Sequence, residues 1–137
     1  MYNGISRHLW EASRVFACDY ALLPWVEQLN KKEILAHYAY LLGSYFIVLH
    51  KISHILLDHL DYLIDEMGDK KGQYSSEEAR LLKAFEAEAD RQAGGLLLVF
   101  FENSLRKNKV GDDLLFPSKL HAYEFYVYAI VVTFKML

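Results

Sequence analysis

Histidines and acidic residues recur at helical spacing in one stretch of the chain. His50 and His54 are four residues apart, and Asp58 follows four residues later. Residues four apart on an α-helix lie on the same face, so these side chains would project in one direction. Imidazole nitrogens and carboxylate oxygens bind transition metals, and helical bundles build metal sites from such pairs. The spacing therefore makes His50, His54 and Asp58 the candidate ligands of a metal-binding bundle.

The apolar residues around this series predict which face of the helix is buried. Two parallel rows have helical spacing and indicate one wide apolar face. The first row is Leu41, Tyr45, Val48, Ile52 and Ile55, and the second is Leu42, Phe46, Leu49, Leu56, Leu60 and Leu63. The opposite, outward stripe contains His37, Tyr40, Ser44, Ile47, Lys51, His54, Asp58, Asp61 and Asp65. Ligands that face outward cannot converge with ligands from other helices, so we expect no tightly bound metal and no other cofactor.

The outward stripe is unusual for a purely solvated surface, because it includes Tyr40 and Ile47. Tyrosine combines a large apolar body with a polar tip and is enriched where proteins meet. Two interpretations stay open, a surface for association and an ordinary solvated face. The candidate interface residues are Tyr40, Ile47, His54, Val131 and Phe134.

No residue pattern supports nucleophilic catalysis, and we assign no catalytic residue. Cys18 is the only cysteine and has no obvious histidine partner nearby in sequence, so we predict a buried structural thiol. Gly94-Gly95 has no preceding strand and no following Gly-Lys-Ser/Thr, which excludes a phosphate loop. We predict instead that these two glycines allow close helix packing.

The candidate residues all lie on predicted helices. One long helix is predicted from a capping box at Asn30 and Glu33 to a stop at Gly68, with a kink at Gly43-Ser44. Another begins at Ser75, ends near residues 107–109, and carries residues 96–101 into the centre of the core. Further helices are predicted over residues 5–22, 25–29 and 118–135. The prediction is an all-α bundle of four main helices and a short one, in a single domain over residues 1–137.

The composition narrows the class of protein. The chain has 137 residues, of which 53% are apolar and 24% charged, as in one ordinary globular domain. Its net charge of −3 argues against a nucleic-acid groove over the whole surface. A single cysteine and the lack of a visible signal peptide favour a cytoplasmic protein. Residues 34–50 lack Asp, Glu, Lys and Arg but include polar groups, so we interpret them as a buried helix rather than a membrane span.

Residues 91–108 form the most distinctive segment, an apolar helix pattern that ends in Glu102, Asn103 and Arg106. It resembles the central helix of HEPN-domain proteins, and residues 106–111 are similar to the Arg-Asn-x-x-x-His neighbourhood of that family. The resemblance implies an all-α bundle, often dimeric, and in many members a metal-independent ribonuclease that uses an Arg and a His. Arg106 would supply the arginine, but residues 111–113 are Gly, Asp and Asp, and His121 is too far along the chain.

The resemblance therefore implies the scaffold rather than the cleavage chemistry. Without a histidine in place, the general base of the reaction is missing. We expect at most weak, salt-sensitive RNA binding by Arg106, Lys107 and Lys109. The alternative is that these cations only complement the dipole at a helix C-terminus.

The functional expectation is a non-catalytic helical interaction module or small subunit that acts through protein association. Ten tyrosines and an apolar C-terminal stretch at residues 131–137 support a homo-oligomer or a protein complex. The alternative is a HEPN-like RNA-binding or RNA-cleaving protein of a defence or toxin system. The third possibility is the metal-binding helical bundle.

Overall fold

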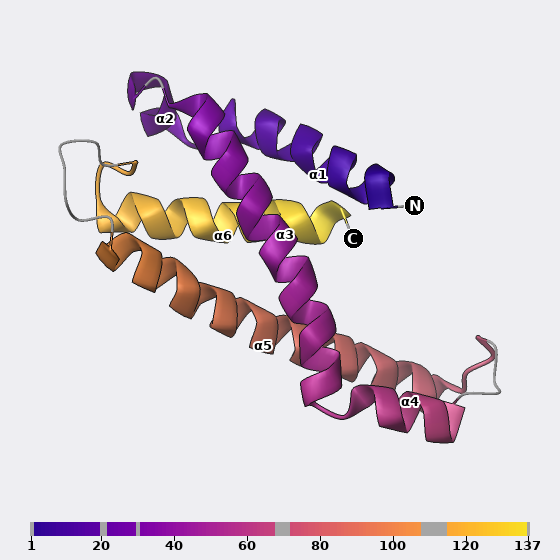
Figure 1. The fold of residues 1–137 in the computed structure, drawn as a ribbon. Coiled ribbons are helices and arrows are strands. Elements are labelled where there is room, and N and C mark those ends of the chain that lie inside the picture. Colours follow the sequence, from indigo (N-terminus) through magenta and orange to yellow (C-terminus); the bar gives the residue numbers. More distant parts are fainter. Residues whose placement is uncertain (1, 20–21, 30, 68–71, 108–114, 137) are drawn as a thin grey trace. The chain divides into compact units, whose positions relative to one another are not determined.

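The chain folds into helices, as the computed structural model in Figure 1 shows. The structure describes residues 2–19, 22–29, 31–67, 72–107 and 115–136. Within these ranges there are six helices and no strand, so the predicted all-α class is confirmed. The helices are α1 (Tyr2–Ala17), α2 (Pro24–Leu29), α3 (Lys32–Leu56), α4 (His59–Met67), α5 (Ser76–Lys107) and α6 (Lys119–Met136).

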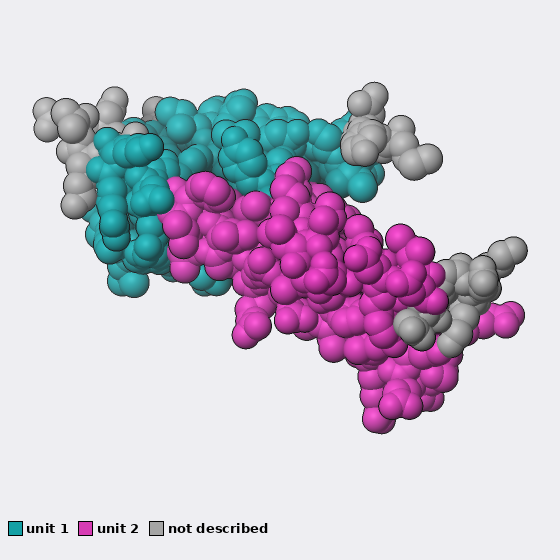
Figure 2. Space-filling view, turned by 60° about the horizontal axis from the view of Figure 1, so that its bottom comes forward, with its two compact units in different colours: residues 1–45, 101–137 teal, residues 46–100 magenta. Residues whose placement is uncertain are grey.

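The helices divide between two compact units, which Figure 2 distinguishes by colour. Unit 1 contains residues 1–45 and 101–137, and unit 2 contains residues 46–100. Helices α3 and α5 each contribute residues to both units. The expectation of a single domain stays a prediction.

Unit 1 has an aromatic core, which accounts for part of the aromatic composition. Helix α1 packs against α6, and the rings of Phe16 and Phe125 lie 5.5 Å apart between centroids. Tyr38 on α3 stacks on Phe125 with ring planes 16° apart. Phe101 at the end of α5 lies 5.1 Å from the ring of Tyr126. Such offset and tilted ring pairs add to the free energy gained from burial itself.

Three helices of unit 1 come close together at Gly43 on α3, because Thr133 lies on α6 and Leu9 on α1. A Cβ atom on Gly43 would lie 2.6 Å from Oγ1 of Thr133 and 3.0 Å from Cδ1 of Leu9. Helix α3 continues through Gly43 and Ser44 without interruption, and the kink there stays a prediction. Close packing at Gly94 and Gly95 is wrong, since a Cβ atom on either would meet no atom within 4 Å.

The predicted long helix breaks in unit 2, at Leu57 and Asp58. Asp58 has a positive φ of 58°, a left-handed conformation that aspartate tolerates better than most residues. The amide of Leu57 still bonds to the carbonyl of Ser53 at 3.0 Å, so α3 is complete up to the break. The chain then starts the separate helix α4 at His59.

The buried face of α3 differs from the predicted one. The whole first apolar row is exposed, and so are Leu56 and Leu60 of the second row. Leu42 and Phe46 are buried as predicted, but Ser53, His50 and His54 complete the buried face. The predicted burial of residues 96–101 holds only for Leu97 and Phe101, whereas the exposed residues there are Leu96, Val99 and Phe100. Burial on a helix with apolar residues on several sides is decided by which side its neighbours cover.

Several helix ends follow from local chemistry. Ser75 caps α5 as predicted: its hydroxyl accepts a hydrogen bond from the Glu78 amide at 3.2 Å, and the Glu78 carboxylate accepts one from the Ser75 amide at 2.8 Å. Helix α6 follows Pro117 as expected. The first helix ends at Ala17 instead of Leu22, and Cys18 is exposed, so the buried thiol is wrong. Asn30 and Gly68, predicted to cap and stop the long helix, lie outside the described residues.

We predict that Gly43→Ala destabilises the protein by about 1 to 3 kcal/mol, because the new methyl group overpacks the contact with Thr133 and Leu9. Gly95→Ala is the matched control, because it also adds one methyl group inside a helix but meets open space. It should stabilise by about 0.5 to 1 kcal/mol through helix propensity. Denaturant unfolding of both variants measures the difference, and equal effects would contradict the close approach at Gly43.

Candidate metal centre

Unit 2 contains three buried histidines that face acidic residues on the opposite helix. His50 and His54 lie on α3, and His59 is the first residue of α4. Their exposed fractions are 6%, 7% and 3%. Helix α5 supplies the carboxylates, from Glu86, Glu88 and Asp90.

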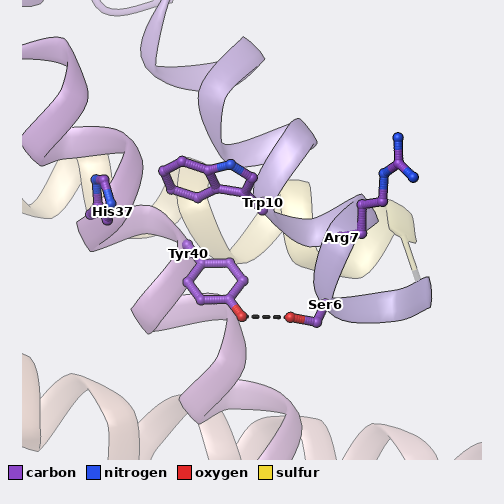
Figure 3. A pocket seen from close by; sticks show the side chains of 5 residues that line it. All are labelled: Ser6, Arg7, Trp10, His37 and Tyr40. Atoms are coloured by element: carbon purple, nitrogen blue, oxygen red, sulfur yellow. Dashed lines mark hydrogen bonds between the residues drawn. The ribbon is translucent and has the colours of Figure 1, made fainter. Parts of the chain in front are cut away.

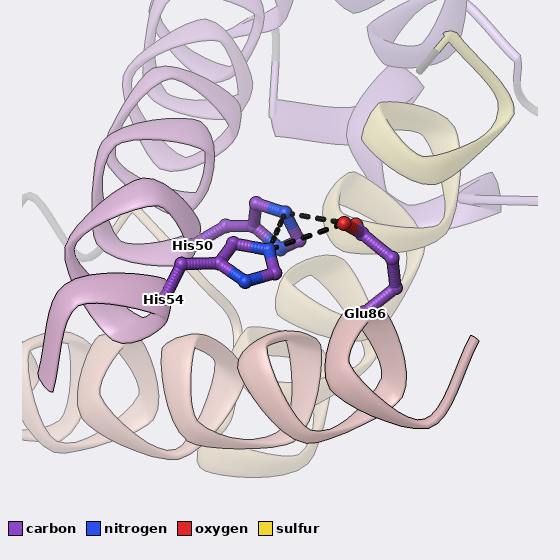
Figure 4. A group of neighbouring side chains, drawn as sticks. All are labelled: His50, His54 and Glu86. Atoms are coloured by element: carbon purple, nitrogen blue, oxygen red, sulfur yellow. Dashed lines mark hydrogen bonds and ion pairs between the residues drawn. The ribbon is translucent and has the colours of Figure 1, made fainter. Parts of the chain in front are cut away.

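Two imidazole rings and one carboxylate converge on a common point (Figure 4). The Nε2 atoms of His50 and His54 are 3.1 Å apart. Oε2 of Glu86 lies 3.2 Å from Nε2 of His50, and its Oε1 lies 3.3 Å from Nε2 of His54. For comparison, neighbouring ligand atoms around a tetrahedral zinc ion with bonds of 2.0–2.1 Å are about 3.3 Å apart.

The remaining nitrogens of the three rings contact carboxylates or each other, away from the point where His50, His54 and Glu86 converge. Nδ1 of His50 lies 2.7 Å from Oδ1 of Asp90, and Nε2 of His59 lies 3.2 Å from Oε2 of Glu88. Nδ1 of His54 lies 3.1 Å from Nδ1 of His59. Every nitrogen of the three rings therefore has a polar neighbour.

When all three rings are neutral, each carries one proton, and the carboxylates behind His50 and His59 determine where the protons lie. A carboxylate oxygen accepts, so Nδ1 of His50 donates to Asp90 and Nε2 of His59 donates to Glu88. Nδ1 of His59 is then an acceptor, and Nδ1 of His54 donates to it. In this all-neutral state the Nε2 atoms of His50 and His54 carry no proton, and their lone pairs face each other and the Glu86 carboxylate. Such an arrangement of electron-rich atoms is repulsive unless a positive charge lies between them.

Burial lowers the pKa of His54 below its ordinary value, because removal from water disfavours the charged imidazolium. The Glu86 carboxylate opposes this shift, and His50, His59 and Lys51 add to it. The neutral imidazole is the form that binds metals. The Glu86 side chain is 61% exposed, so the group opens to solvent on the side of α5.

The predicted outward position of the histidines is thus wrong for His54, which is buried and cannot form part of an exposed interface. Asp58, the third predicted ligand, is exposed at the helix break and is not part of the group. Glu86 takes that place. It was missed although Glu86, Glu88 and Asp90 alternate along a predicted helix, because nothing in the sequence pairs that helix with residues 50–59.

The remaining candidate interface residues are more accessible. Val131 and Phe134 on α6 are exposed, and Ile47 is half-buried. Tyr40 is half-buried, and its hydroxyl lies 2.6 Å from that of Ser6. Figure 3 shows these two residues at a shallow pocket of unit 1, which is also lined by Arg7, Trp10 and His37. Its rings pack on one another, with Trp10 and His37 centroids 4.5 Å apart.

The predicted RNA-binding residues are partly described. Arg106 and Lys107 are exposed in the last turn of α5, whereas Lys109 and residues 111–113 lie outside the described residues. His121 lies at the start of α6, where its Nδ1 is 2.7 Å from the Ser118 hydroxyl and its ring packs on Trp25. RNA binding at Arg106 stays a prediction.

Comparisons with protein families, with curated proteins and with solved structures give no match to this chain. Function is therefore argued from the site alone. In the part of the chain that the structure describes, α3 is long and apolar enough to cross a membrane, with 39% of its most apolar window buried. Core helices of soluble proteins pass the same test, so this is weak evidence for a membrane span.

We predict that Ser53→Ala stabilises the protein. The Ser53 hydroxyl is fully buried on α3 and has no hydrogen-bond partner among the described residues. Its removal relieves a desolvation penalty and should raise the free energy of unfolding by about 1 kcal/mol. Denaturant unfolding measures this change, and a loss of stability would show that the hydroxyl has a partner in solution.

Proposed function

We propose that the chain binds one divalent transition-metal ion through His50, His54 and Glu86. The observation that carries the proposal is the convergence of two Nε2 atoms and a carboxylate at 3.1 to 3.3 Å. A metal ion supplies the positive charge that these atoms require. The competing occupant is a single proton, which would make one of the buried imidazoles cationic.

The chemistry of the ligands favours the zinc class of ions. Two imidazole nitrogens and one carboxylate suit Zn²⁺ or Fe²⁺, whereas Ca²⁺ and Mg²⁺ prefer oxygen ligands alone. Asp90 behind His50 is the outer partner that metal-bound histidines usually have. Three protein ligands leave at least one coordination position for water or another small ligand, as in catalytic rather than structural zinc sites. The exposed side of Glu86 is where such a ligand would enter.

We predict that the protein, purified without a histidine tag, binds about one equivalent of Zn²⁺. His54→Ala or Glu86→Ala should weaken binding by on the order of 100-fold or more, because each removes a ligand. Free Zn²⁺ at about 100 times its dissociation constant should stabilise the folded protein by about 2.7 kcal/mol. Calorimetric titration, elemental analysis and thermal unfolding provide the measurements.

His8→Ala is the matched control, because His8 is an exposed histidine outside the group and its loss should leave Zn²⁺ binding unchanged. Equal losses in His8→Ala and His54→Ala would show non-specific binding. A wild-type protein that binds no divalent transition metal would leave the proton as the occupant and refute the proposed function.

Self-association is the second candidate function, and one surface feature favours it. The first apolar row, Leu41, Tyr45, Val48, Ile52 and Ile55, is 40–60% exposed along α3, and we call it the α3 stripe. Its 4-3-4-3 spacing is that of a coiled-coil seam. A twofold axis lets one stripe serve both partners, so the proposed occupant is the α3 stripe of a second copy of this chain.

We predict that the wild-type protein is a dimer and that Ile52→Glu makes it monomeric, because a charge in the seam would be buried without a partner. Light scattering after size exclusion measures the mass over a range of concentrations. Lys32→Glu, an exposed change on the same helix outside the α3 stripe, should leave the dimer intact. A wild-type monomer at every concentration, or partition of the chain into lipid vesicles through α3, would contradict the dimer.

A further inference from the structure

We propose that His59 and Glu88 are positioning residues that keep Nε2 of His54 unprotonated and directed at the metal. The inference rests on the proposed function and assigns a role to two members of the cluster that are not proposed as metal ligands. His50 has a carboxylate directly behind it, in Asp90. On its Nδ1 side, His54 reaches a carboxylate only through a second imidazole, that of His59.

The break between α3 and α4 is what places His59 beside His54. On a continuous helix, residues five apart are about 140° apart around the axis, so their side chains point in different directions. The turn at Asp58, with its positive φ, redirects the chain and returns His59 to the face that His54 occupies. The result is an Nδ1 to Nδ1 distance of 3.1 Å between two buried rings.

The ring of His59 is held on its other sides as well. It stacks on Phe85 with 4.2 Å between centroids and 17° between ring planes. Its Nε2 lies 3.2 Å from the Glu88 carboxylate. This bond keeps the proton on Nε2, so Nδ1 of His59 is an acceptor with a fixed direction.

The tautomer of His54 follows from that acceptor. The proton of His54 lies on Nδ1 because His59 accepts it there, and Nε2 keeps the lone pair for the metal. Without His59 the buried Nδ1–H would lose this acceptor, and His54 could move its proton to Nε2, where it would block the metal. Outer partners of this kind typically change metal affinity 10- to 100-fold.

The test replaces His59 by an aromatic ring that can stack on Phe85 but cannot accept a hydrogen bond from His54. His59→Phe retains an aromatic ring against Phe85 and removes both nitrogens. We expect Zn²⁺ affinity to fall by about 10- to 100-fold. In the metal-free protein, nitrogen-15 NMR of the imidazole rings should show His54 protonated at Nδ1 in the wild type and partly at Nε2 in the variant. Tyr62→Phe, which alters another ring neighbour of Phe85, should change neither.

Glu88 provides a graded second test. Glu88→Gln keeps an oxygen that accepts from His59, so it should retain most of the affinity and the His54 tautomer. The leucine of Glu88→Leu cannot accept a hydrogen bond from His59. This variant should therefore change the Zn²⁺ affinity and the His54 tautomer as His59→Phe does. A purely structural role for Glu88 would change unfolding without moving the His54 tautomer.

The outcomes separate this inference from the metal site itself. If His54→Ala loses Zn²⁺ but His59→Phe binds it as tightly as the wild type, the positioning role is wrong and the metal site stands. If the wild type binds two ions and His59→Phe binds one, His59 is a ligand and the positioning role is also wrong. A wild type that binds no Zn²⁺ would refute both proposals.

Discussion

The buried histidines of unit 2 depend on the break at Leu57 and Asp58. A continuous helix would carry His59 away from His54, and the contact between their Nδ1 atoms could not form. A positive φ raises the conformational energy of any residue that has a side chain. Aspartate adopts the left-handed conformation seen at Asp58 more readily than most residues do. The local conformation of one residue therefore determines whether His59 lies beside His54.

The imidazole rings and carboxylates of this cluster stabilise the fold only when they are connected to one another. Burial of an imidazole is unfavourable unless its nitrogens have partners, and here the carboxylates of α5 terminate the chain of rings at both ends. With neutral rings, this order of donors and acceptors places the lone pairs of His50 and His54 together, beside Glu86. A cation at that point would stabilise the packing of α3 on α5 in unit 2, so metal binding and folding of this unit would be coupled.

Exposed apolar surface is the other unusual feature of α3. The residues that the sequence most strongly suggests as core form the α3 stripe, while polar residues of the same helix are buried. An apolar stripe with coiled-coil spacing has a physical use only against another apolar surface. The proposed dimer would use one face of α3, and the metal site would use another.

The sequence by itself determined the helical class, the start of α5 at its Ser75 capping box and the start of α6 after Pro117, because these depend on local chemistry. It also identified His50 and His54 as a pair, since helical spacing is a local property. Only the tertiary structure decided that His54 faces inward and that Glu86 completes the group, because both depend on which helix lies opposite. The helix break at Asp58 escaped prediction for a related reason: no glycine or proline marks it, and the contacts of His59 with His54, Phe85 and Glu88 hold it in place.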